Sequence, residues 1–157
     1  MDEAELKKAK FYGLRVINFR PRSSEELITK LKDKGYAEDI ITEVILEFEK
    51  KGLLNDTKFS RLWIESRMAR RPKGASVLRQ ELKAKGVKEE VIDKALDSLK
   101  NNYSEYEVVK NLADSRMPAL EGLDKTTAKR RLVGYLQRRG FDFDTIMKVV
   151  EEEFKNQ

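Results

Sequence analysis

The sequence predicts an all-α protein made of three tandem three-helix repeats in an elongated, curved array. Two observations lead to this fold class. First, the segment that begins at Arg20 matches the segment that begins at Arg71 without a gap, and a third copy follows. Second, the 157 residues include only 8 Gly and 3 Pro, while 39% are hydrophobic, which favours long helices over a turn-rich sheet.

The repeat is clearest at one glycine that occupies the same position in each copy. Gly35 matches Gly86 at an offset of 51 residues, and Gly86 matches Gly140 at an offset of 54. Apolar positions keep the same offsets, as in the triplets Leu31, Leu82, Leu136 and Ile41, Ile92, Ile146. These matches divide the chain into repeat 1 (residues 1–52), repeat 2 (residues 53–103) and repeat 3 (residues 104–157).

The first helix of repeat 1 is expected over residues 3–18 and ends before Pro21, which cannot continue it. Apolar residues at helical spacing predict its buried stripe: Leu6, Phe11, Leu14 and Ile17.

Capping signals place the second and third helices of this repeat. Ser23 or Ser24 is expected to cap the second helix, and Glu26 completes a capping box with Ser23. Gly35 suits the left-handed position after its end. The third helix is expected over residues 37–51, where Ile40, Ile41, Val44, Ile45 and Phe48 form an apolar face.

The same signals recur in repeats 2 and 3. Ser104 with Glu107 forms another capping box, and residues 118–124 form a looser connection that we expect to act as a hinge. Three apolar residues of the fourth helix either close the junction between repeats 1 and 2 or belong to the core of repeat 2: Phe59, Leu62 and Trp63.

Composition argues against an enzyme. The chain has no Cys and no His, which excludes disulfides, His-based triads and the usual zinc ligands. The carboxylates Asp142 and Asp144 are better explained by one of them capping a helix. We therefore expect no catalytic residues, no metal and no cofactor. The acidic N-terminus and short apolar runs predict neither a signal peptide nor a membrane span, so a cytoplasmic protein is expected.

The net charge of +5 is concentrated in repeat 2, which has 12 basic and 7 acidic residues, whereas repeats 1 and 3 are balanced. Two segments are strongly basic: residues 66–85, the first basic segment, and residues 125–139, the second basic segment. Like charge at this density repels itself, so we expect both segments to share one concave, partner-binding face. The acidic starts of the third helices disfavour base reading by a helix-turn-helix.

Several short motifs resemble those of the RecX family. Arg20, Arg22 and Ser23 followed by Glu26-Leu27, Lys30-Leu31 and Gly35 are similar to its R-x-R-S and E-L-x-x-K-L-x-x-K-G signature. Residues 52–56 with Phe59 resemble its G-L-L-N-D stretch, with Ser60 in place of the usual alanine. Arg67, Gly74, Glu81-Leu82, Lys85-Gly86-Val87 and Arg138-Arg139-Gly140-Phe141 resemble its later elements.

The resemblance implies a monomeric regulator, mainly an inhibitor, of the RecA recombinase in DNA recombination, DNA repair and the SOS response. It implies binding to the RecA filament and to single-stranded or duplex DNA, with effects on filament extension, strand exchange and ATP hydrolysis. Candidate contacts from the resemblance and from the charge pattern are Arg20, Arg22, Arg67, Arg70, Arg71, Lys73, Gly74, Arg79, Lys129, Arg130, Arg138 and Arg139.

Two other functions compete with this one. The first is a nucleic-acid-binding helical protein that acts without RecA, which stacking aromatics beside the basic residues would favour; Tyr135 is the one ring in such a place. The second is a structural adaptor whose charge serves solubility alone.

Overall fold

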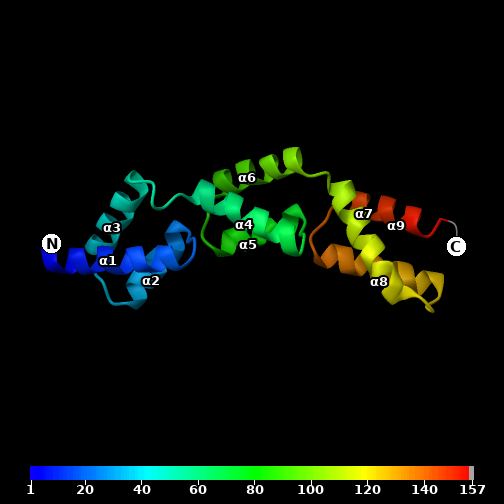
Figure 1. The fold of residues 1–157 in the computed structure, drawn as a ribbon, viewed down its shortest axis with the longest axis horizontal. Coiled ribbons are helices and arrows are strands. Elements are labelled where there is room, and N and C mark those ends of the chain that lie inside the picture. Colours follow the sequence, from blue (N-terminus) through cyan, green and yellow to red (C-terminus); the bar gives the residue numbers. More distant parts are fainter. Residues whose placement is uncertain (156–157) are drawn as a thin grey trace. The chain divides into compact units, whose positions relative to one another are not determined.

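The computed structural model describes residues 1–155, and within this range it contains nine α-helices, one short 3₁₀ helix and no strand (Figure 1). The all-α prediction is therefore confirmed. The helices are α1 (Glu3–Phe19), α2 (Ser24–Asp33), α3 (Glu38–Lys50), α4 (Asp56–Arg70), α5 (Ala75–Ala84), α6 (Glu89–Asn102), α7 (Glu105–Arg116), η1 (Met117–Leu120), α8 (Lys125–Arg138) and α9 (Phe143–Glu153).

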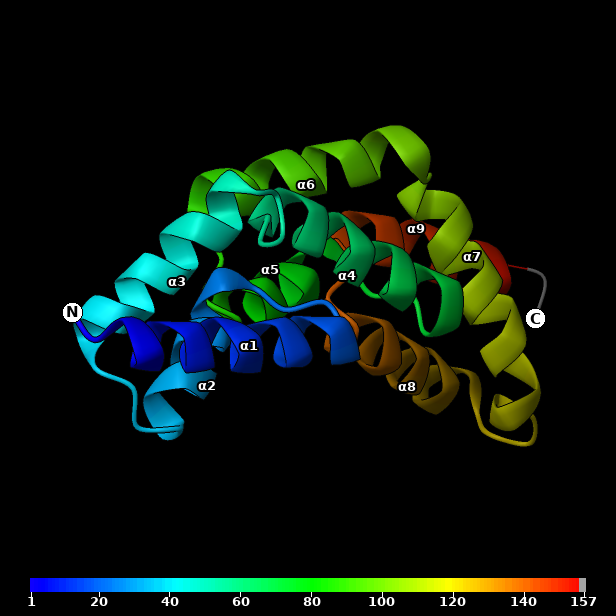
Figure 2. The ribbon, with the colours of Figure 1, turned by 60° about the vertical axis from the view of Figure 1, so that its left-hand side comes forward.

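The chain forms two compact units, and the division between them runs through the middle helix triplet. Unit 1 consists of residues 1–63 and 82–93, and unit 2 consists of residues 64–81 and 94 onwards. As a result α4, α5 and α6, which are labelled in Figure 2, each contribute one end to unit 1 and the other end to unit 2. The middle triplet thus divides its residues between the two units.

Unit 1 is built around the packing of α1, α2 and α3 on one another. Its fully buried side chains include Leu27, Leu31 and Val44. The predicted capping box at the start of α2 is confirmed: Ser23 accepts from the Glu26 N–H, and the Glu26 carboxylate accepts from the Ser23 N–H. The first four backbone N–H groups of a helix have no hydrogen-bond partner within the helix, so the bonds of this capping box fix where α2 begins.

The buried stripe predicted for α1 is only partly right. Leu6 is buried, but Phe11 is 66% exposed and Leu14 is 36% exposed. Ala9 and Gly13 face the core instead. A Cβ at Gly13 would lie 2.9 Å from the Phe48 ring, so α1 approaches α3 too closely for a larger side chain. Ala9 and Gly13 occupy the buried face of α1 because small residues allow this close contact between the helices.

Unit 2 contains the packed triplet α7, α8 and α9 with the core side chains Val109, Leu132, Leu136, Ile146 and Val149. Caps again set the boundaries. Ser104 accepts from the Glu107 N–H, and Asp142 caps α9 by accepting from the Thr145 N–H. The connection expected to be a loose hinge folds in part into η1, which buries Leu120.

The three repeated glycines have the left-handed backbone that the repeat predicts. Their φ angles are +95° at Gly35, +77° at Gly86 and +86° at Gly140. Each follows the second helix of its triplet, where a residue without a Cβ closes the turn at least cost.

The apolar residues of α4 lie at the junction between the first and second triplets. Phe59 is buried and stacks on Trp63 with 6.0 Å between ring centroids. Phe59 and Leu62 line a hollow together with Pro21 and Arg22, which precede α2. The junction interpretation is thus favoured over an internal core role. The Asp56 carboxylate helps to cap α2, because it accepts from the Ser24 N–H at 2.8 Å.

Candidate partner-binding surface

The turn after α5 docks onto the start of α2 inside unit 1. The Ser23 hydroxyl, fully buried, donates to the Lys85 carbonyl at 2.6 Å. The Glu26 carboxylate accepts from Arg20 at 2.9 Å and from Lys85 Nζ at 3.2 Å. Burial raises the pKa of Glu26, but bonds from Arg20, the Ser23 N–H and Lys85 outweigh it and leave the pKa below its usual value. We call these bonds the first docking contact.

The turn after α8 docks onto the start of α5 inside unit 2 in the equivalent way. The Gly74 N–H donates to the Arg139 carbonyl at 2.7 Å, and Arg139 Nη1 donates to the Pro72 carbonyl at 3.4 Å. Gly74 is the repeat equivalent of Ser23, and Arg139 is that of Lys85. A Cβ at Gly74 would collide with the Gly140 carbonyl, so this second docking contact requires glycine.

Four of the predicted contact residues therefore have internal partners. Arg20, Gly74 and Arg139 belong to the docking contacts. Arg67 forms two bonds with Glu81, Nε to Oε1 at 3.1 Å and Nη2 to Oε2 at 2.9 Å, which tie α4 to α5. Such two-point arginine–carboxylate pairs hold both side chains in one geometry, so Arg67 does not present its charge freely to a partner.

Two more predicted residues are also held internally. Arg22 donates to the Val16 carbonyl at 3.4 Å, and burial together with the charge of Arg20 lowers the pKa of its guanidinium. Lys129 on α8 pairs with Glu151 on α9 at 3.4 Å.

A different subset of the predicted cations points away from internal partners. Of the predicted contact residues, all of which lie in the described part of the chain, four exposed arginines form no hydrogen bond and no ion pair through their side chains: Arg70, Arg71, Arg130 and Arg138. All four lie in unit 2, two at the end of α4 and two on α8. Arg79 is half-buried on α5 and makes internal interactions.

Tyr135, the ring that would have supported a nucleic-acid binder, is already engaged. The guanidinium carbon of Arg116 lies 4.7 Å from the ring centroid, and that of Arg139 lies 4.8 Å from it. Cation–π contacts of this kind occupy ring surface that a base would need. Tyr135 is therefore better explained as part of the second docking contact than as a stacking platform.

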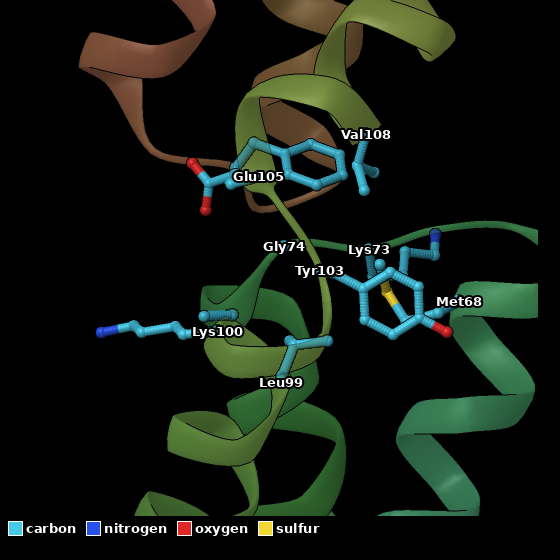
Figure 3. A pocket seen from close by; sticks show the side chains of 10 residues that line it. Met68, Lys73, Gly74, Leu99, Lys100, Tyr103, Glu105 and Val108 are labelled. Carbon is cyan, nitrogen blue, oxygen red and sulfur yellow. The ribbon is translucent and has the colours of Figure 1, made fainter.

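Lys73 and Gly74 lie at the edge of a small apolar pocket in unit 2 (Figure 3). Met68, Leu99 and Tyr103 line it with them, and its volume is about 50 Å³. Small-molecule sites usually span about 300–1,000 Å³, so this pocket is too small for a substrate. In residues 1–155 no group of three or more His, Cys, Asp or Glu side chains could hold a metal ion.

None of the helices in the described part of the chain combines the length and the apolar character that crossing a membrane demands.

The docking residues Ser23 and Lys85 were not among the predicted sites. The signal that identifies them is the repeat itself, because Ser23 and Gly74 are equivalent, as are Lys85 and Arg139. A pair of positions that recurs in two copies indicates a contact between repeats as readily as a contact with a partner.

Comparison with known proteins assigns every helix triplet to the same family. Models of the first, second and third three-helix domains of RecX match residues 9–48, 55–96 and 103–150. The regulatory protein RecX of Amycolatopsis mediterranei is 33% identical over 153 residues, which cover 98% of this chain and 87% of that protein. The RecX of Prosthecochloris aestuarii is 31% identical over 99% of this chain and 100% of its own.

A solved structure shows the same fold. The crystal structure of RecX from Lactobacillus salivarius superposes with a TM-score of 0.83 and 22% identity, covering 95% of this chain and 96% of that chain.

Proposed function

Since this chain belongs to the RecX family of regulatory proteins, we propose that it regulates the RecA recombinase, mainly as an inhibitor. It binds the RecA–DNA filament and hinders filament extension, strand exchange and ATP hydrolysis, and it acts by binding rather than by catalysis. The observation that carries this proposal is the match of all three RecX domains along nearly the whole chain. DNA recombination and repair in the cytoplasm are the processes in which such a regulator acts.

The surface that we assign to filament binding consists of four of the predicted contact residues, the exposed arginines Arg70, Arg71, Arg130 and Arg138 of unit 2. Guanidinium groups without internal partners are available to phosphates or to carboxylates of RecA. This choice differs from one based on sequence spacing, which would pair Arg67 with Arg71. Because Arg67 is bound to Glu81, its reversal would disturb the fold as well as any binding.

The test is the double reversal Arg70→Glu with Arg71→Glu. Its control is Lys50→Glu with Lys51→Glu, which also reverses the last residue of a helix and the residue after it. The control differs in one respect, because it also removes the exposed pair of Lys51 with Glu47 at 3.7 Å, which contributes little. Both variants share the cost of a negative charge at a helix C-terminus, about 0.3–1 kcal/mol per charge. Only the arginine pair should relieve the inhibition of RecA's DNA-dependent ATP hydrolysis.

Binding to RecA filaments and to bare DNA separates the chemistry of the contact. If the arginines touch phosphates, both kinds of binding weaken, and the salt dependence of DNA binding falls by about one unit for each phosphate that is no longer neutralised. If they touch an acidic face of RecA, filament binding collapses and bare-DNA binding changes little. Unchanged binding to both, in a variant with an unaltered circular dichroism spectrum, would refute the assignment of this surface.

A further inference from the structure

A groove in unit 1 combines exposed aromatic rings with positive charge. It has a volume of about 660 Å³, within the range of ligand sites. Residues of α1 and of the turn between α2 and α3 line it: Ala4, Lys7, Lys8, Phe11, Tyr12, Arg15, Lys34 and Tyr36. The equal numbers of acidic and basic residues in repeat 1 did not indicate this site, because a segment without net charge can still have one positively charged face.

Helical spacing explains how α1 provides one wall. Ala4, Lys8, Phe11 and Arg15 follow one another at intervals of three or four residues, so they lie along a single face. This face is the one left outside when Ala9 and Gly13 turn to the core. The tight approach of α1 to α3 is therefore what exposes Phe11.

The charge in the groove is of one sign. Apart from the two tyrosines, every ionisable residue that lines it is a cation, namely Lys7, Lys8, Arg15 and Lys34. Glu5 meets Lys8 at 4.0 Å, but both side chains are exposed. A pair of this kind contributes little and leaves the groove positive.

Two of the three rings pack on each other, and the third, that of Phe11, has no ring of the described residues packed against it. Tyr12 and Tyr36 pack at 6.4 Å between centroids, and Lys34 Nζ lies 5.2 Å from the centre of the Tyr12 ring. Phe11 is 66% exposed, and no other ring of the described residues packs against it. A large apolar ring left in water beside four cations favours a ligand with both flat apolar surfaces and negative charge.

We propose that this groove binds single-stranded nucleic acid, with a base stacked on Phe11 and phosphates held by Arg15 and the lysines. Single strands expose the base faces that such a platform needs, whereas a duplex hides them. An acidic peptide would satisfy the cations but gives no reason for the exposed ring. The inference rests on the proposed function only in its choice of partner class, and it adds a site in the first RecX domain.

The experiment measures binding of the full chain to a fluorescent oligothymidine of about 20 nucleotides, long enough for several stacked bases. An abasic oligonucleotide of equal length and a polyglutamate peptide serve as probes for charge alone. The stacking variant is Phe11→Ala, and its control is Phe19→Ala, which removes a ring that is 83% exposed on the same helix but outside the groove. The charge variant is Arg15→Glu, with Lys50→Glu as its control.

Phe11→Ala should weaken the binding of oligothymidine about tenfold, because it removes the ring on which one base stacks. It should leave the binding of the abasic oligonucleotide unchanged. Arg15→Glu should weaken both and lower the salt dependence by roughly 0.7 for each phosphate that is no longer neutralised. Unchanged oligothymidine binding by Phe11→Ala would overturn the proposal. A second outcome would also overturn it: Arg15→Glu weakens the binding of all three probes equally, while Phe11→Ala has no effect on binding. That result would identify an acidic protein segment as the partner.

RecA ATP hydrolysis provides a separate readout. If the wild-type chain does not slow ATP hydrolysis by RecA while the oligonucleotide results are as expected, the proposed regulation of RecA is refuted and the proposed nucleic-acid groove is supported. If the chain slows ATP hydrolysis by RecA but Phe11→Ala leaves oligothymidine binding unchanged, the regulation of RecA is supported and the nucleic-acid groove is refuted.

Discussion

Replacing Gly140 by alanine tests whether the turn after α8 docks onto the start of α5 as the structure shows. Gly140 has a φ of +86°, and a Cβ built on it would lie 2.6 Å from both Cγ2 and the backbone nitrogen of Val77. Gly122 has the same φ of +86°, but a Cβ there would meet nothing within 4 Å. The two alanine variants therefore share the backbone strain and differ only in the contact.

The strain of an alanine at this φ costs about 1–2 kcal/mol and applies to both variants. In Gly140→Ala the turn must also move away by roughly 1 Å, because carbon atoms rest at about 3.5–4.0 Å. Such overpacking costs about 1–3 kcal/mol. Breaking the bond between the Gly74 N–H and the Arg139 carbonyl adds about 1 kcal/mol. We expect Gly140→Ala to be destabilised by about 2–4 kcal/mol more than Gly122→Ala.

Urea unfolding followed by circular dichroism measures this difference, and amide hydrogen exchange locates it. The Gly74 N–H should exchange faster in Gly140→Ala and at the wild-type rate in Gly122→Ala, because only the first substitution opens the contact. Equal destabilisation of the two variants, with Gly74 protected in both, would refute the second docking contact.

Two further predictions concern unit 1. The Ser60 hydroxyl is fully buried without a hydrogen-bond partner, so Ser60→Ala should stabilise the protein by about 1 kcal/mol and raise the melting temperature by roughly 2–4 °C; a lower melting temperature would show that the hydroxyl is bonded in solution. The folded-state pKa of Glu26 lies below its ordinary value of 4.5, so its contribution to stability is present above that pH and is lost as the pH falls through the lowered pKa. Glu26→Gln should therefore be less stable than the wild type at pH 7, with a difference that shrinks in thermal melts below about pH 4.5, and a difference independent of pH would contradict the ion pairs with Arg20 and Lys85.

Local signals in the sequence were sufficient for the helices and their ends. The Ser23 capping box and the positive φ of Gly35 depend on residues a few positions apart, and such patterns are readable without a structure. The same holds for the repeat, since copies of one fold need the same residue types at the same turns.

Contacts between repeats were not readable in this way. The bond from Ser23 to the Lys85 carbonyl joins residues 62 positions apart, and any side chain at position 85 would offer the same carbonyl. The face of α1 was mispredicted for a related reason. Hydrophobicity alone favours burying Phe11, but only the approach of α3 shows that Gly13 must occupy that space.

The docking contacts also change how the family motifs should be interpreted. In the segment Arg138-Arg139-Gly140-Phe141, Phe141 is buried, Gly140 closes the turn and Arg139 reaches the Pro72 carbonyl, so three of four residues serve assembly. In this segment, which lies within the described residues, Arg138 alone is exposed without an internal bond from its side chain. In this chain, the segment that resembles a RecX motif therefore serves mainly to hold the second three-helix domain to the third. Residues that bind a partner are better sought where a charge or ring has no internal contact, as in Arg138 and Phe11.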